Sequence, residues 1–378
     1  MRCRHLVLLA LVLPLATPAG AAGTQAELGR ALFFDVNLSH NRSQSCASCH
    51  MPERAFSDGR GTAAGAASLG DDGTSIGDRN APTAAYARFV PAFGRNASGN
   101  WAGGLFHDGR AATLEDQAGG PPLNPAEMGM GSKAAVVARL KENPGYVAAF
   151  EALHGAGVLE DDAKAYAAMT SAIAAFERTP EFSPFDSKYD RFLRGAAKLT
   201  EEEELGRVLF FSNQFTNCRS CHQLQALGGA AEETFSNYAF HNIGVPVNTA
   251  LRAANGSAPG RIDDGLAANP AVKGEPAQRG KFRTPSLRNV AVTGPYMHNG
   301  VFRDLRTVIL FYNKYNSKSA RRQINPETGQ PWAAPEVADT VALKELEAGP
   351  ALKDREIDAL VAFLKTLTDQ RYEPLLAR

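Results

Sequence analysis

The chain has 378 residues, and its 40 lysines and arginines balance its 40 aspartates and glutamates, so the formal net charge is zero. A chain of balanced charge has no electrostatic reason to bind nucleic acid or an anionic lipid surface, and neither class of partner is expected. The length is sufficient for two domains.

The first residues have the three parts of a secretory signal peptide. A short basic start, MRCRH, precedes the apolar run LVLLALVLPLA, and small residues follow in TPAGAAG. The apolar run is too short to span a bilayer, and Cys3 lies ahead of it. We therefore expect residues 1–23 to be removed and the mature protein to be exported to the periplasm, without insertion into the membrane.

Two segments of eight residues are nearly the same. ELGRALFF covers residues 27–34, ELGRVLFF covers residues 204–211, and seven of the eight positions agree. Just ahead of these segments, Thr24 and Thr200 each precede a glutamate by three residues, which is the spacing of a capping box. Each segment is therefore predicted to open a helix, and the chain is predicted to be a duplication.

Each repeated segment leads to the pentapeptide C-x-x-C-H, and the two copies use four of the five cysteines. This pattern occurs in thioredoxin-like redox pairs, in parts of zinc sites and in covalent haem anchors. In a haem anchor both cysteines form thioethers with the haem vinyl groups, and the histidine binds the iron. Two complete copies favour two c-type haems, which would be held by Cys46, Cys49 and His50 and by Cys218, Cys221 and His222.

The duplication predicts one haem domain at residues 24–185 and a second at residues 186–378. Apolar residues at helical spacing predict two further helices, one ended by Pro180 and one near the C-terminus. Their apolar faces are Tyr166, Met169, Ile173 and Phe176, and Ile357, Leu360, Val361, Leu364 and Leu367. No clear strand alternation is found, and 35 glycines and 22 prolines predict much loop, including residues 316–350. The expected fold class is mainly α with long loops.

Three further stretches carry a resemblance to a known family. They are RNAPT (79–83), HDGRAATLEDQAGGPPLNPAEMGM (107–130) and FRTPSLRNVAVTGPYMHNG (282–300). Together with the two motifs, they resemble the bacterial dihaem cytochrome c peroxidases and their MauG-type relatives. The resemblance implies two cytochrome c-like haem domains, in which hydrogen peroxide meets the N-terminal haem and the C-terminal haem handles electrons.

The segment after SIG (75–77) distinguishes the two branches of this family. In the cytochrome peroxidases a histidine follows SIG and closes the sixth position of the first haem until the enzyme is reduced. Here DRN follows, and no histidine occurs between His50 and His107. A hard, exposed carboxylate such as Asp78 is a poor haem ligand, so the first haem is expected to be open, as in the MauG type.

The resemblance also supplies an acid–base group for this open position. Glu127 and Gln117 match the distal glutamate and glutamine of the family, and Pro121 matches a distal proline that shapes the pocket. A glutamate can take a proton from bound peroxide and return it to the departing oxygen, while the glutamine holds the ligand. From residue type alone, Glu127 could instead cap a turn in NPAEMGM.

At the second haem, the family usually places a methionine opposite the proximal histidine. The matching position here is Tyr312, and the MauG type also has tyrosine there. A thioether favours Fe(II), whereas a phenolate is hard and anionic and stabilises oxidised iron. The alternative is that Tyr312 is an ordinary helix-face aromatic and that Met297 ligates the iron.

The chain departs from both branches at position 107, where the family places a tryptophan between the haems. His107 is harder to oxidise than indole, and it is either a relay or a hydrogen-bonded core histidine. Trp101 is close in sequence and could substitute. Thr216 replaces a surface tryptophan of the MauG type. His241 and His298 are expected to line the second haem.

The resemblance implies one calcium ion between the domains, bound by Asn80 and by the backbone oxygens of Thr293 and Pro295. One amide and two carbonyl oxygens, completed by water, are suitable ligands for this hard cation.

These features predict a MauG-like oxidoreductase that uses hydrogen peroxide to form high-valent iron and oxidises a periplasmic protein partner, with tryptophan residues as candidate targets. The alternative is a cytochrome c peroxidase that takes electrons from a small cytochrome or cupredoxin. A non-enzymatic dihaem electron carrier is the third hypothesis, against which an open site with Gln117 and Glu127 argues.

Overall fold

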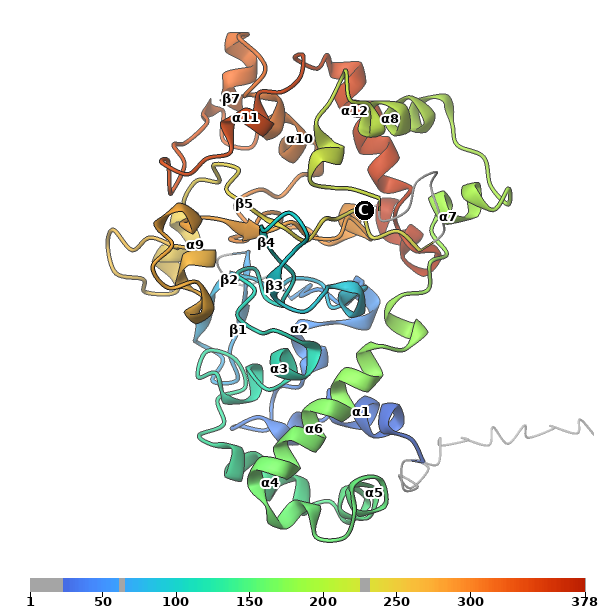
Figure 1. Cartoon of the computed structure of the whole chain (residues 1–378), viewed down its shortest axis with the longest axis vertical. Helices are drawn as coiled ribbons and strands as arrows, with labels where there is room; N and C mark the ends of the chain where they lie inside the picture. Colours follow the sequence, from blue (N-terminus) through green and yellow to red (C-terminus); the bar gives the residue numbers. More distant parts are fainter. Residues whose placement is uncertain (1–22, 61–64, 225–231, 378) are drawn as a thin grey trace, which may run out of the picture.

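The computed structural model describes residues 23–60, 65–224 and 232–377, so the expected signal peptide lies outside the described residues apart from its last position. Figure 1 shows two halves stacked along the long axis, with the N-terminal half below and the C-terminal half above. No helix in the described ranges is both long enough and apolar enough to cross a membrane.

The N-terminal half is built from helices around one apolar core. The helices are α1 (Gln25–Phe33), α2 (Cys46–Cys49), α3 (Leu114–Ala118), α4 (Lys133–Lys141), α5 (Pro144–His154) and α6 (Asp162–Glu177). The predicted helix ahead of Pro180 is α6, which buries one face against α1. Its core is rich in aromatic rings: Phe33, Phe176 and Phe182 meet edge to face.

The C-terminal half repeats this arrangement. Its helices are α7 (Lys188–Leu193), α8 (Glu201–Phe211), α9 (Thr249–Ala254), α10 (Leu305–Asn313), α11 (Leu343–Leu346) and α12 (Asp354–Lys365). The predicted C-terminal helix is α12; it ends before Leu367, which is nonetheless fully buried in the turn that follows. The apolar cluster of the first half ends at Phe185 and that of the second begins at Tyr189, and we keep the boundary after residue 185 as a proposal.

Strands are few and short, and each pairs with one antiparallel neighbour. The pairs are β1 (Ala67–Leu69) with β2 (Ile76–Asn80), β3 (Gly94–Arg95) with β4 (Trp101–Ala102), β5 (Phe240–His241) with β6 (Phe282–Arg283), and β7 (Ile324–Asn325) with β8 (Gln330–Pro331). The stretch predicted as loop, 316–350, holds only β7, β8, α11 and a 3-10 turn. The prediction of a mainly α fold is confirmed.

The duplicated segments form the same helix pair in each half. Thr24 caps α1 by accepting a hydrogen bond from the backbone N of Glu27, and Thr200 caps α8 in the same way, each at 3.2 Å. A Cβ on Gly29 of α1 would lie 1.8 Å from the backbone oxygen of Ala172 in α6. A Cβ on Gly206 of α8 would lie 1.9 Å from the backbone oxygen of Ala359 in α12. Each glycine therefore allows two helix backbones to touch.

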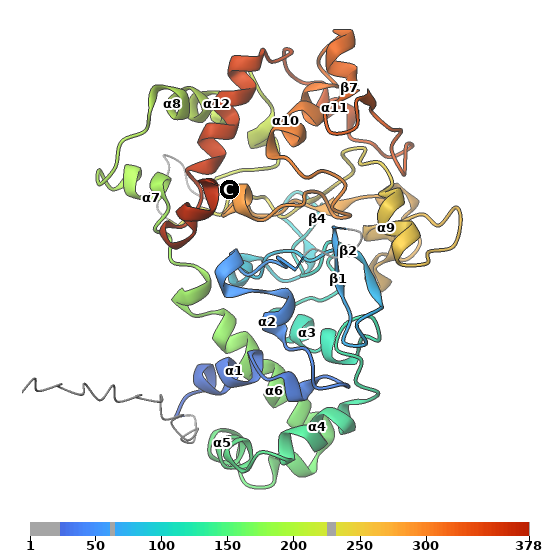
Figure 2. The same cartoon turned by 180° about the vertical axis from the view of Figure 1, so that it is seen from behind.

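Strand β2 joins the two halves. Arg79 binds Asp263 at 2.7 Å, and Asp78 binds Arg261 at 2.7 Å between Nη2 and Oδ2. The backbone N of Asn80 donates to the backbone oxygen of His298, in the second half, at 2.8 Å. Figure 2 shows β1 and β2 rising from the lower half toward α9. The carboxylate of Asp78 is thus paired with Arg261.

We expect Gly29→Ala and Gly206→Ala each to lower the free energy of unfolding by about 1–3 kcal/mol, because the added methyl group overpacks a backbone-to-backbone contact. The better helix propensity of alanine offsets about 1 kcal/mol at most. Denaturant titration of the holoprotein measures this effect. Gly131→Ala is the matched control, since nothing lies within 4 Å of its added Cβ. Equal stability of all three variants would contradict the close crossing.

Candidate functional site

The first C-x-x-C-H motif forms the short helix α2, and its histidine ends that helix. The backbone N of His50 bonds to the backbone oxygen of Cys46 at 2.9 Å. His50 Nδ1 lies 3.1 Å from the backbone oxygen of Phe56. A carbonyl oxygen can only accept, so Nδ1 carries the proton and Nε2 keeps a free lone pair for a metal.

The second motif repeats this geometry. The backbone N of His222 bonds to the backbone oxygen of Cys218 at 2.9 Å. His222 Nδ1 donates to the backbone oxygen of Phe235, also at 2.9 Å. Burial lowers the pKa of His222 to about 4, so the imidazole is neutral and can act as a ligand at physiological pH.

Both accepting carbonyls belong to a buried phenylalanine with a left-handed backbone. The φ angle is 54° at Phe56 and 57° at Phe235, and both rings are fully buried. A bulky residue in this region costs about 1–2 kcal/mol, which packing of its ring must offset. The same local strain therefore aims a carbonyl at the histidine in both halves.

The thiols do not have the properties of a redox pair. All four cysteines of the motifs are free. Burial raises the pKa of Cys46 to about 12 and that of Cys221 to about 11, whereas a reactive C-x-x-C pair needs a lowered thiol pKa. Within the described ranges, no group of three or more His, Cys, Asp and Glu side chains could hold a metal ion, so a zinc site is not supported.

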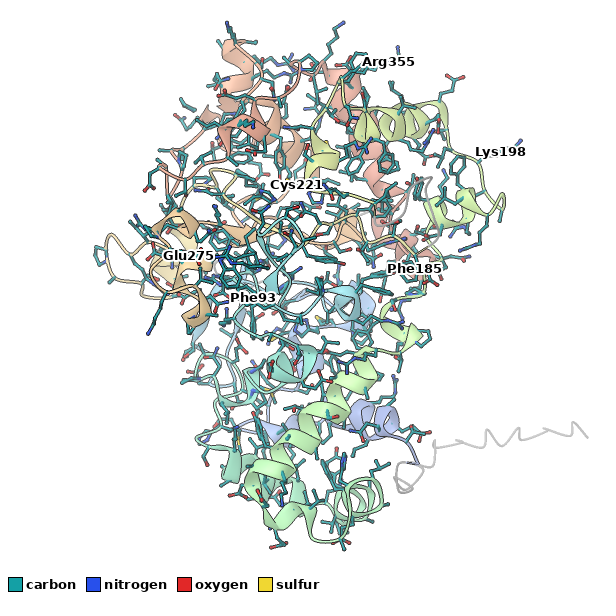
Figure 3. All side chains as sticks on the ribbon, in the orientation of Figure 1. Phe93, Phe185, Lys198, Cys221, Glu275 and Arg355 are labelled. Carbon is teal, nitrogen blue, oxygen red and sulfur yellow. The ribbon has the colours of Figure 1, made fainter. Side chains whose placement is uncertain are left out.

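One continuous cavity of about 840 Å³ contains both motifs. All the candidate residues line it, from both halves: Cys46, Cys49, His50, Asn80, His107, Gln117, Pro121, Glu127, Cys218, Cys221, His222, Thr293, Pro295 and Tyr312. Cys221 lies in the C-terminal half (Figure 3).

The cavity wall fits a large apolar group that carries anions. The residues His241, His298 and Arg283 line it, and within the described part of the chain His241 Nε2, His298 Nε2 and Arg283 Nε are buried without a hydrogen-bond partner. Buried polar groups are normally bonded, so these atoms indicate that a further group belongs in the cavity. Four thiols and two neutral histidines complete the donor set expected for two covalent haems.

The predicted acid–base residues line the cavity, and Glu127 lies close enough to the first motif to act on the thiols of Cys46 and Cys49. Gln117 lies in the last turn of α3, and Pro121 begins the 3-10 turn Pro121–Leu123. Glu127 Oε1 accepts a hydrogen bond from Asn124 Nδ2 at 2.9 Å. Burial raises the pKa of Glu127, which suits a carboxyl group that exchanges a proton near neutral pH.

Tyr312 projects from α10 into the part of the cavity that holds the second motif. Burial raises the pKa of its phenol, and the nearby Cys221 and Cys218 raise it further. In the described part of the chain its hydroxyl has no hydrogen bond. Met297 also lines the cavity, so both candidate ligands are present, and the proximity of Tyr312 to the cysteines favours tyrosine.

His107 has the geometry of a hydrogen-bonded core histidine. Its Nε2 donates to the backbone oxygen of Asn80 at 2.9 Å, and burial lowers its pKa to about 4. Trp101 is not in the cavity wall. Its ring stacks on Phe93 at 4.9 Å and its Nε1 donates to Glu275 at 3.1 Å; both partners are labelled in Figure 3.

Two of the three predicted calcium ligands are in contact. The amide nitrogen of Asn80 lies 2.6 Å from the backbone oxygen of Pro295. A half-turn of the amide would bring two oxygens together, which is favourable only with a cation between them. The donor set therefore fits a hard cation, although it includes no carboxylate.

Comparisons with known proteins agree with this geometry. The family model for di-haem cytochrome c peroxidase matches residues 23–198. The methylamine utilization protein MauG of Paracoccus denitrificans is 55% identical to this chain over 97% of each protein. This chain belongs to the dihaem cytochrome c peroxidase family and is of the MauG type. As a member of that family it holds two haems and is an oxidoreductase.

Further relatives extend the same assignment. MauG of Methylophilus methylotrophus is 31% identical, covering 87% of this MauG-type chain and 84% of the relative. The crystal structure of the dihaem peroxidase BthA of Burkholderia thailandensis superimposes with a TM-score of 0.81 at 35% identity, covering 96% of this chain and 90% of that one. The predicted duplicated cytochrome c-like architecture is therefore supported by sequence and fold.

Three features of the site were not found from the sequence. Glu177 ends α6, is 4% exposed and lines the cavity, and burial raises its pKa to about 8. Arg79 joins Asp108 and Asp263 at 2.7 Å each. Arg283 lies in the stretch FRTPSLRNV, which carried the family resemblance. That stretch was a signal for Arg283, and RNAPT (79–83) was one for Arg79, whereas Glu177 reaches the cavity only through the packing of α6.

We expect the mature MauG-type protein to carry two covalent haems, because both motifs present complete donor sets. Replacing Cys218 and Cys221 by alanine should leave one haem, and the matched pair Cys46→Ala with Cys49→Ala should leave the other. Mass spectrometry after acid–acetone extraction counts them. A wild-type protein with fewer than two covalent haems would contradict the assignment.

Proposed function

We propose that this MauG-type enzyme uses hydrogen peroxide to oxidise a protein partner in the periplasm. Bound haem supplies the peroxide chemistry and the storage of oxidising equivalents. The proposal rests on a difference between two otherwise matching haem sites. The buried carboxyl group of Glu127 lies near the first motif, and the buried phenol of Tyr312 lies near the second.

The residues of the first site are suited to proton transfer. We assign Glu127 as the acid–base residue, since its raised pKa lets it take a proton from peroxide and return it to the leaving oxygen. The Asn124 hydrogen bond fixes one carboxylate oxygen and leaves Oε2 for the ligand. Gln117 orients that ligand through its amide, and Pro121 shapes the pocket wall.

The residues of the second site are suited to storing oxidising equivalents. A phenolate from Tyr312 disfavours reduced iron, so this haem would be a poor entry port for electrons from a donor. The free phenol keeps its proton well above neutral pH, so ligation requires the positive charge of the iron to displace that proton.

The identity with a Paracoccus protein named for methylamine utilization supports a partner from that process, with tryptophan residues of the partner as candidate targets. Because both motifs lie in an internal cavity, the partner would bind outside and be oxidised at a distance. We further propose one calcium ion at Asn80, Thr293 and Pro295, and export by residues 1–23.

The second candidate is a cytochrome c peroxidase that draws electrons from a small cytochrome or cupredoxin. His107 favours it, since a neutral imidazole bound to a carbonyl is a poor relay for charge between the haems. Thr216 favours it as well, because it removes an oxidisable side chain beside the second motif.

We expect Glu127→Gln to retain both haems and to slow the reaction with peroxide by roughly 10²–10⁴-fold. The base form is needed, so the wild-type rate falls as pH drops through the pKa of Glu127. Because burial raises that pKa, this acid limb lies above the ordinary carboxyl value of about 4.3, and it disappears in the variant. Stopped-flow mixing over a pH series measures both effects. Glu115→Gln is the control, since Glu115 pairs with Arg178 on the surface.

We expect Tyr312→Met to raise the potential of the second haem and to impair oxidation of a protein partner, because the anionic ligand is lost. Turnover with a reduced cytochrome should survive or improve. Redox titration and absorption spectra follow the change, and Tyr315→Phe is the control on the same helix end. If Tyr312→Phe leaves the spectrum of the second haem unchanged and the wild type takes electrons rapidly from a cytochrome, the second candidate replaces the first.

A further inference from the structure

Four arginines line the cavity, and in the described ranges one of them lacks a carboxylate partner. Arg79 is held by Asp108 and Asp263, Arg110 by Asp108, and Arg261 by Asp78. Within the ranges that the structure describes, Arg283 of β6 forms no ion pair, and its Nε is sealed from solvent without a hydrogen-bond partner.

Among the described residues, no carboxylate pairs with Arg283. Its one aromatic neighbour is Tyr238, whose ring lies 5.7 Å from the guanidinium carbon. Burial lowers the pKa of Arg283 to about 10, and Tyr238 opposes this shift only slightly. A guanidinium withdrawn from water without an anion costs several kcal/mol. The side chain therefore requires an anion that the described residues do not provide.

A haem placed in the cavity brings such anions in its two propionate carboxylates. The planar guanidinium matches a carboxylate through two parallel N–H···O bonds. We propose that Arg283 binds a propionate of the haem held by Cys218, Cys221 and His222, and that it is a positioning residue that sets the potential of that haem.

The backbone around Arg283 connects it to this haem. Thr284 N donates to the backbone oxygen of Ala239 at 2.8 Å, and Ser236 Oγ donates to the backbone oxygen of Thr284 at 2.8 Å. Residues 282–284 are thus joined to the segment that begins at Phe235, the partner of the proximal histidine. The backbone N of Arg283 also donates to the backbone oxygen of His107 at 2.9 Å. The same strand therefore reaches the interface between the halves.

The inference has a physical consequence for the second haem. A guanidinium beside the propionate offsets its negative charge, which would otherwise stabilise oxidised iron. It also keeps the propionate ionised as the pH falls, since an opposite charge lowers a carboxyl pKa. This argument requires only that the haems are present, so it is independent of peroxide chemistry and of the protein partner.

The test is a spectroelectrochemical titration of wild type, Arg283→Gln and Arg283→Lys from about pH 5 to about 8, the range of weak carboxyl and imidazole groups. Arg279→Gln is the control, since Arg279 pairs with Asp264 at 2.9 Å outside the cavity. The wild-type potential of the His222 haem at each pH is the reference, since the Tyr312 phenol can also exchange a proton when this haem is reduced. Arg283→Gln should lower the potential and make it rise more steeply than in wild type as the pH falls, because the unpaired propionate then takes up a proton. Arg283→Lys should restore most of the wild-type value.

Three results would overturn the inference. One is a Gln variant with unchanged potentials, the second is an equal shift in the Gln and Lys variants, and the third is a shift confined to the His50 haem. The thioethers retain the haem in either variant, and mass spectrometry confirms this. If Arg283→Gln fails to fold, Arg283→Met takes its place in the same comparison, with the same three outcomes.

Discussion

The hydrogen bond from histidine Nδ1 to a backbone carbonyl is the interaction on which the site depends. It fixes the tautomer at His50 and His222, and it points each Nε2 into the cavity. In both halves the accepting carbonyl belongs to a phenylalanine in a left-handed conformation. Such a conformation persists only where packing determines it, so the aromatic core holds the metal-binding geometry as well as the fold.

The two halves share a scaffold and differ in the side chains that they place in the cavity. In each, a capped helix crosses a second helix at a glycine, and the chain leads from there to the cysteines. The first half then adds Glu127 from a loop, whereas the second adds Tyr312 from α10. Duplication thus explains the common anchor, and the long connections explain how one site came to present a carboxyl group and the other a phenol.

The sequence was sufficient where the signal is local. The caps at Thr24 and Thr200 and the apolar faces of α6 and α12 each depend on a few neighbouring residues, and each was predicted correctly.

Features that depend on pairing between distant segments could not be predicted. The contacts of β2 with the C-terminal half are one case, and the absence of a carboxylate partner at Arg283 in the described residues is another. Trp101 seemed a candidate relay because it is near His107 in sequence. The chain turns at Gly103 and Gly104, where φ is 76° and 73°, and carries the indole away from the cavity.

The shared cavity also has a consequence for the biosynthesis of the protein. Each half has its own core and its own attachment motif, but the walls around both motifs come from the two halves together. Thioether formation requires the attachment machinery to reach thiol and vinyl groups at the same time. Because residues of both halves line the cavity around each motif, we expect haem attachment to precede the contacts of β2 with Arg261 and Asp263.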